Sequence, residues 1–164
     1  MSSVSTIGLA FSPRAKSIGC HAMRAHHVHI EHEFAKPPQR VFAFLAEHEN
    51  LAEVFGAKVT RLRDGEDGER NGVGSVRKLQ IGPLAPFEET VMEFVPSERI
   101  VYRITKGSPL RDHLGVMELT PTYAGTRFVY DIRLGSSIPG LALLVRAALT
   151  RSIERSLPKV ERDA

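Results

Sequence analysis

The sequence is poor in the residues that build disulfide and metal centres. It has one cysteine, Cys20, and no tryptophan. A lone cysteine cannot form an intrachain disulfide, and it offers no cysteine pair of the kind that binds structural zinc. No apolar run approaches the roughly 20 residues that a membrane-spanning helix needs. We therefore expect no metal, no cofactor and no stable membrane insertion, and we expect a cytoplasmic protein.

The sequence also lacks a strong charge of either sign. Its formal net charge is +3, and charged residues make up 25% and hydrophobic residues 42% of its 164 positions. These proportions are typical of an ordinary globular chain, and the length suits one domain. There is no long basic run and no basic–aromatic interleaving, so nucleic acid is not an expected partner. Composition leaves the oligomeric state open.

Acidic residues are absent before Glu31, and residues 1–24 are rich in serine and glycine. The longest apolar piece there, residues 7–11, is interrupted by Gly8 and is shorter than the core of about 7–15 residues of a secretory signal. We expect residues 1–24 to be a disordered tail, or an extension upstream of a true start at Met23. A weak organelle-targeting signal is the alternative. The folded domain is expected at residues 25–162.

What the chain does contain is a regular alternation of apolar and polar residues, which is typical of half-buried strands. Pro37 and Pro38 end the first strand and open a helix. A second short helix is expected between an N-cap at Asn50 and a left-handed cap at Gly56. Strands are expected at residues 26–34, 58–62, 75–81, 85–95, 99–105, 110–120 and 126–134, and a long helix at residues 139–160.

This order predicts an α+β fold. Short turns between consecutive strands make the seven-stranded sheet antiparallel. One face of each strand is apolar, and only the terminal helix is long enough to cover that face, so the sheet should curve around it. The predicted sheet-facing stripe of this helix consists of Leu141, Leu144, Val145, Ala148, Leu149, Ser152 and Ser156. Because Ala148 and Ser152 are small, we expect a ligand cavity between them and the sheet.

Four phrases of the sequence carry a family resemblance: FAKPPQRVFAFLAEHENLAEVF, GVGSVRKLQIG, FEETVMEFVPSERIVYRIT and GVMELTPTYAGTRFVYDIRL. Together with the element order, they resemble the SRPBCC superfamily, the helix-grip fold of birch-pollen-allergen-like proteins, START domains and polyketide cyclase/dehydrase proteins. The resemblance covers about residues 28–160. It rests on a scaffold signature made of Pro38, Val41, Gly72, Gly74, Pro96, Tyr102, Thr120, Pro121, Gly125 and Thr126. Phe55 stands where members typically carry a tryptophan at the cavity mouth.

The histidine-rich run HHVHIEH has two interpretations. His27 and His29 would project from one face of the first strand, as two metal ligands would. A metal site, however, needs a third and a fourth ligand with orienting partners. A solvated strand face is the better interpretation.

Several polar side chains fall on strand faces that should point inward. They are Arg77, Tyr102, His113 and Tyr130; His32 lies near a strand end, and Glu89 is ambiguous because residues 88–95 alternate poorly. His113 is a candidate catalytic base, and Tyr102 or Arg77 could stabilise an enolate oxygen. The alternative is that each is a core residue with its polar atoms satisfied by neighbours. The expected ligand-binding residues are Phe55, Arg77, Leu79, Tyr102, Ile104, His113, Met117, Phe128, Tyr130, Leu144, Val145, Ala148 and Ser152.

Two functions remain open. The first is a carrier or sensor of a hydrophobic small molecule, such as a lipid, a quinone or a polyketide-like aromatic, because an apolar pocket with a few polar anchors is the usual form of such a site. The second is a polyketide cyclase, aromatase or dehydratase that uses a cavity His/Tyr pair. A deep pocket with these groups facing each other favours the second, and polar groups at the mouth alone favour the first.

Overall fold

The computed structural model describes residues 25–83 and 85–164. The expectations for residues 1–24 lie outside the described part of the chain. The strands are β1 (His26–Phe34), β2 (Lys58–Arg63), β3 (Val76–Gln80), β4 (Phe87–Val95), β5 (Arg99–Lys106), β6 (Leu110–Pro121) and β7 (Thr126–Ser136). The helices are α1 (Pro38–Ala46), α2 (Leu51–Phe55), a short 3-10 turn at Glu66–Gly68, and α3 (Leu141–Asp163).

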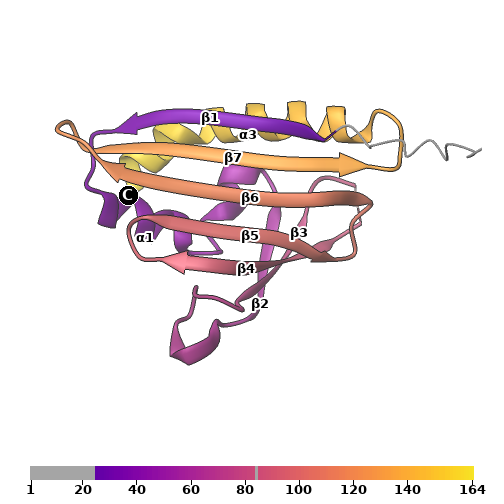
Figure 1. Ribbon diagram of the computed structural model, residues 1–164, viewed down its shortest axis with the longest axis horizontal. Helices are drawn as coiled ribbons and strands as arrows, with labels where there is room; N and C mark the ends of the chain where they lie inside the picture. Colours follow the sequence, from indigo (N-terminus) through magenta and orange to yellow (C-terminus); the bar gives the residue numbers. More distant parts are fainter. Residues whose placement is uncertain (1–24, 84) are drawn as a thin grey trace, which may run out of the picture.

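All seven strands form one antiparallel sheet in the order β1-β7-β6-β5-β4-β3-β2. The first strand therefore pairs with the last, and the meander from β2 to β7 fills the rest of the sheet. Figure 1 shows α3 running beside β1 and β7, with α1 and α2 beneath the same face of the sheet. The predicted α+β architecture, with two short helices after the first strand, is confirmed.

The inner face of the sheet follows the alternation of the sequence. Tyr102 on β5, Met117 on β6 and Phe128 on β7 are buried, and Val28 and Ile30 on β1 extend the same core. Side chains on one face of a strand recur every second residue, so these positions all point toward the helices. This face carries the hydrophobic core and, between the sheet and the first half of α3, the candidate site.

The phase predicted for α3 is partly wrong. Leu141, Val145 and Leu149 do face the cavity, but Leu144 is 68% exposed and Ala148 also lies on the solvent side. The buried stripe continues through Ile153 and Val160, and it includes Ser156 as predicted. The helix begins at Leu141 after Gly140, so Pro139 precedes it, contrary to the expectation. The small-residue argument was wrong because Ala148 is exposed and Ser152 packs against α2, where its Oγ donates to Val54 O.

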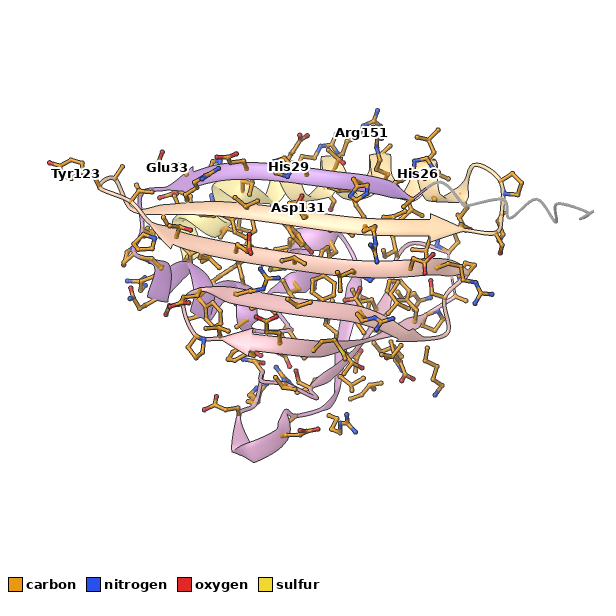
Figure 2. The ribbon with its side chains drawn as sticks, viewed as in Figure 1. His26, His29, Glu33, Tyr123, Asp131 and Arg151 are labelled. Carbon is orange, nitrogen blue, oxygen red and sulfur yellow. The ribbon has the colours of Figure 1, made fainter. Side chains whose placement is uncertain are left out.

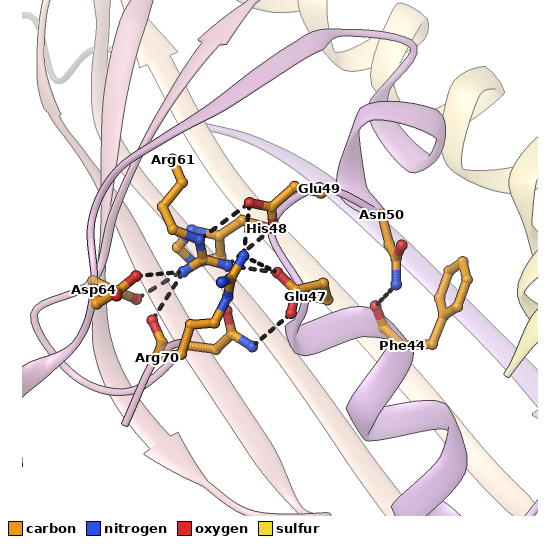
Figure 3. Close-up of polar contacts among 10 residues, drawn as sticks. Phe44, Glu47, His48, Glu49, Asn50, Arg61, Asp64 and Arg70 are labelled. Carbon is orange, nitrogen blue, oxygen red and sulfur yellow. Dashed lines mark hydrogen bonds and ion pairs between the residues drawn. The ribbon is translucent and has the colours of Figure 1, made fainter. Parts of the chain in front are cut away.

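Polar contacts hold the α1–α2 turn against β2. Figure 3 shows the Arg61 guanidinium between carboxylates, with Nη2 2.6 Å from Glu47 Oε1 and 3.0 Å from Glu49 Oε2. Asn50 does not cap α2 with its side chain; its Nδ2 donates to Phe44 O at 3.0 Å. The expected left-handed cap at Gly56 is present, with φ 60.

The outer face of β1 and β7 is polar and exposed (Figure 2). His29 Nδ1 lies 2.7 Å from Asp131 Oδ1, and His27 is opposite Arg133 in the register. Among the residues described, no group of three or more His, Cys, Asp or Glu side chains is arranged to hold a metal ion. His29 is paired with an aspartate and His27 lies opposite an arginine. Such charged neighbours are typical of a solvent-exposed strand face.

Gly115 generates a stability prediction. It lies opposite Tyr102 in the β5–β6 register, and an added Cβ would collide with the Tyr102 ring. Gly115→Ala should therefore lower the free energy of unfolding by about 1–3 kcal/mol, as overpacking does. Gly135→Ala on β7 is the matched control, because its Cβ would meet only Arg111 O at 3.5 Å. Chemical denaturation measures both; equal stability of the two variants would contradict the packing argument.

Candidate functional site

A cavity of about 130 Å³ lies between the inner face of the sheet, α2 and the first half of α3. Its wall is almost entirely apolar, and the polar side chains that reach it are Glu89, Tyr102, His113 and Ser108. The full lining is Phe55, Leu79, Ile81, Ala85, Phe87, Glu89, Tyr102, Ile104, Ser108, Pro109, Leu110, His113, Ile132, Leu141, Val145 and Leu149. Apolar walls with a few polar groups are the usual form of small-molecule sites.

A buried ion pair lies at the polar part of the cavity wall. Arg77 on β3 and Glu89 on β4 are opposite each other in the strand register and are 3% and 4% exposed. Arg77 Nε donates to Glu89 Oε2 at 2.9 Å, and Nη2 approaches the same oxygen at 2.8 Å without hydrogen-bond alignment. Removing either partner would leave an unpaired buried charge, which costs about 3–5 kcal/mol.

His113 reaches the cavity in the same inward phase as Gly115, Met117 and Leu119, and it lies next to a bulge in β6. The register of β6 against β7 shifts between Arg111 and Leu114, and Asp112 has φ 50. A bulge inserts one extra residue and redirects the side chains that follow it. His113 keeps the phase of the buried residues that follow it, and the Ile104 backbone N–H, beyond the last β5–β6 pair, donates to His113 Nδ1 at 3.2 Å.

This hydrogen bond sets the tautomer of His113. Because Nδ1 accepts a proton donor, the neutral ring carries its own proton on Nε2. Burial lowers the pKa of His113, which Glu89 opposes only in part, so the neutral ring is the form present near pH 7. Nε2 lies 3.8 Å from Glu89 Oε1. His113 therefore presents a hydrogen-bond donor to the cavity, with a carboxylate oxygen beside it.

The two buried tyrosines are coupled to each other. Tyr102 and Tyr130 share a short hydrogen bond between their hydroxyls, and burial is the first cause that raises the pKa of both. Arg77 Cζ lies 4.5 Å from the Tyr102 ring centroid, and the His113 ring is 5.6 Å from the same centroid. Tyr102 thus offers its ring to the cavity, and its hydroxyl is already occupied.

A second buried histidine lies behind the ion pair. His48 Nε2 is 3.4 Å from Ser75 Oγ, and His48 Nδ1 has no hydrogen-bond partner. Burial, with the positive charges of Arg77 and Arg61, lowers the pKa of His48 to about 3. Figure 3 shows His48 next to the Arg61 network.

The structure divides the predicted ligand-binding residues into four groups. Six line the cavity: Phe55, Leu79, Tyr102, Ile104, His113 and Val145. Four are buried behind its wall: Arg77, Met117, Phe128 and Tyr130. Leu144 is exposed on the solvent side of α3. Ala148 and Ser152 line a surface depression between α2 and α3, where Ser152 Oγ donates to Val54 O at 3.1 Å.

Glu89 is the site residue that sequence reasoning left undecided. The alternation of β4 is interrupted by a register shift between Val91 and Glu93, which hides the inward phase of Glu89. A signal was nevertheless present: Arg77 was expected to face inward on the preceding strand, and a buried arginine needs a carboxylate nearby. Phe87, Glu89 and Val91 also alternate correctly before the shift.

Comparison with known protein families shows to which family the chain belongs. The profile described as "Polyketide cyclase / dehydrase and lipid transport" matches residues 25–164. The chain belongs to this family. The expected resemblance to polyketide cyclase-like SRPBCC proteins is thereby confirmed. None of the curated proteins matches the sequence.

Solved structures share the fold of this polyketide cyclase/dehydrase family member. A Thermus thermophilus protein matches with TM-score 0.66 and 20% identity over 84% of this chain and 96% of that one. The Zhui aromatase/cyclase of a Streptomyces species matches with TM-score 0.62 and 20% identity, over 85% and 91%. A Rhizobium loti protein matches with TM-score 0.61 and 24% identity, over 85% and 99%. At these identities the likeness shows the fold alone.

Within the described residues of this family member, no helix has the length and hydropathy to span a bilayer.

His48 generates a pH prediction. Its folded pKa of about 3 lies below the ordinary value, so between about pH 6.5 and 3 the unfolded chain binds a proton that the folded chain does not. Stability is therefore lost as the pH falls, at up to about 1.4 kcal/mol per pH unit from this group. His48→Gln should make the fall of the unfolding free energy across this window shallower. Denaturation at several pH values measures it, with exposed His27→Gln as control; parallel profiles for all three proteins would contradict the argument.

Proposed function

We propose that the protein binds a hydrophobic small molecule in this cavity, as a carrier or sensor. The observation that carries the proposal is the composition of the cavity wall: side chains from five strands and α3 converge on it, and nearly all are apolar. Removing apolar ligand surface from water is favourable by about 25 cal/mol per Å². Membership of a family whose description includes lipid transport supports this function.

The ligand classes that suit this wall are a lipid chain, a quinone or a polyketide-like aromatic. A cavity of about 130 Å³ is close to the engineered cavity of about 150 Å³ that binds benzene. It would therefore enclose one ring or a short chain segment, with the rest of a larger ligand extending past the loop at Ser108 and Pro109. A cytoplasmic location agrees with the single cysteine.

The second candidate function is cyclase or dehydratase chemistry, and the pairing of Glu89 with His113 favours it. His113 cannot act as the base in this tautomer, because its free nitrogen Nε2 carries the proton. Glu89 Oε1 would instead take the proton from a carbon between two carbonyl groups, and His113 Nε2–H would donate to the enolate oxygen. The matching Zhui structure is named an aromatase/cyclase, which makes this chemistry worth testing.

Filling the cavity tests the first function. Val145→Phe places a ring in the cavity and should abolish binding of toluene, followed by saturation-transfer NMR. Its unfolding free energy should stay within about 1 kcal/mol of wild type, whereas overpacking a dense core costs about 1–3 kcal/mol. Leu144→Phe, one residue earlier on the solvent side, should bind toluene as wild type does. Toluene binding that survives Val145→Phe would refute this site, and native mass spectrometry of protein from its own host would identify a natural ligand.

The second function, cyclase or dehydratase chemistry, is tested by looking for a reaction product. Incubation with a synthetic linear triketide thioester should give a cyclised product that has lost one water, seen by mass spectrometry. His113→Gln should reduce the rate by about 10²–10⁴ with binding largely kept, if His113 is a catalytic proton donor. A carrier would give no product above the buffer rate, and His113→Gln would then change affinity only.

A further inference from the structure

Two polar atoms on the cavity wall have no hydrogen-bond partner among the described residues. Glu89 uses Oε2 for both contacts with Arg77, which leaves Oε1 toward the cavity. His113 uses Nδ1 for the Ile104 N–H, which leaves Nε2. The two free atoms are 3.8 Å apart, too far for a hydrogen bond to each other. One oxygen atom can lie within about 2.8 Å of both of them.

The types of these atoms specify the group that would join them. Glu89 Oε1 belongs to a carboxylate held opposite the Arg77 guanidinium, so it only accepts hydrogen bonds. His113 Nε2–H only donates. A ketone or ether oxygen would satisfy His113 alone, an ammonium group would satisfy Glu89 alone, and a ligand carboxylate would be repelled by Glu89. A hydroxyl both donates and accepts at one atom, and so satisfies both.

The remaining wall specifies the body that carries the hydroxyl. Leu79, Phe87, Ile104 and Val145 are among the apolar side chains around the pair, and the cavity of about 130 Å³ approaches the size of one that holds benzene. The Tyr102 and Tyr130 hydroxyls hydrogen-bond to each other, and Tyr130 is buried behind the cavity wall. Arg77 and Glu89 cancel in charge, so the site favours a neutral ligand.

We propose that the cavity binds a neutral hydroxylated six-membered ring, a phenol in its simplest form, whose hydroxyl donates to Glu89 Oε1 and accepts from His113 Nε2. This inference rests on the proposed binding function and narrows its ligand class. The hydroxyl takes the place of water at the pair, so neither buried group loses its hydrogen bond when the ring enters.

Three probes of similar shape separate the contributions of the apolar wall, the His113 donor and the Glu89 acceptor to affinity. Toluene has no polar group, anisole only accepts a hydrogen bond, and phenol both donates and accepts. Calorimetric titration at pH 7 should show phenol binding at least about tenfold more tightly than anisole, because hydrogen bonds to charged groups are the stronger kind. His113→Phe and Glu89→Gln should each reduce this preference to within about threefold. Glu93→Gln is the matched control. The Glu93 carboxylate is on the same strand as Glu89 but pairs with Arg99 on the outer side, so this variant should keep the preference for phenol.

Each outcome has one meaning. Equal affinities for the three probes in wild type, or a phenol preference that both His113→Phe and Glu89→Gln retain, would overturn the hydroxyl site and leave the apolar cavity standing. Failure of all three probes to bind would overturn the proposed binding function itself. If Glu89→Gln unfolds, because Arg77 loses its buried partner, His113→Phe alone decides, since it leaves the ion pair intact.

Discussion

The buried pair of Arg77 and Glu89 is the constraint on which the site depends. Two charges inside an apolar core are tolerated only when they meet, and the β3–β4 register places them directly opposite each other. Their contact fixes the guanidinium against the Tyr102 ring and leaves one carboxylate oxygen facing the cavity. A one-residue slip of this register would turn one of them to solvent and leave the other buried and unpaired.

Two irregularities of the sheet complete the arrangement. The bulge near Asp112 shifts the β6–β7 register, and the β5–β6 pairing ends at Tyr102 and Gly115, so the Ile104 N–H bonds the His113 ring and sets its tautomer. Gly115, two residues further along, makes room for the Tyr102 ring. The hydrogen bond that sets the position of the His113 proton therefore forms where regular strand pairing ends.

These features explain why family membership narrows the candidate functions to a carrier and a cyclase but does not decide between the two. The fold supplies an apolar cavity under a sheet, and carriers and cyclases of this family use the same scaffold. What distinguishes them is the chemistry of a few inward groups. Here that chemistry is a carboxylate acceptor beside a neutral histidine donor, the pair that we propose as the binding site of a ligand hydroxyl.

The sequence by itself determined the fold. Strict alternation in residues 99–105 and 126–134 fixed strands with one buried face, and Pro37, Pro38 and Gly56 marked the helix boundaries because their backbone conformations are restricted or unusual. The inward phase of Tyr102, His113 and Tyr130 followed from the same period. Each of these signals is local, and local backbone geometry is what a sequence pattern encodes directly.

Only the tertiary structure decided the site. Glu89 was hidden by a β4 register shift, which breaks the period on which the prediction relied. The face of α3 was misjudged because Leu144 and Ala148 fit a helical stripe as well as the truly buried Ile153 does, and packing alone chose between them. The proton of His113 depends on a hydrogen bond from Ile104, nine residues away and on another strand. A sequence period specifies which side chains share a face, but which atoms then meet depends on bulges, register and packing across the whole sheet.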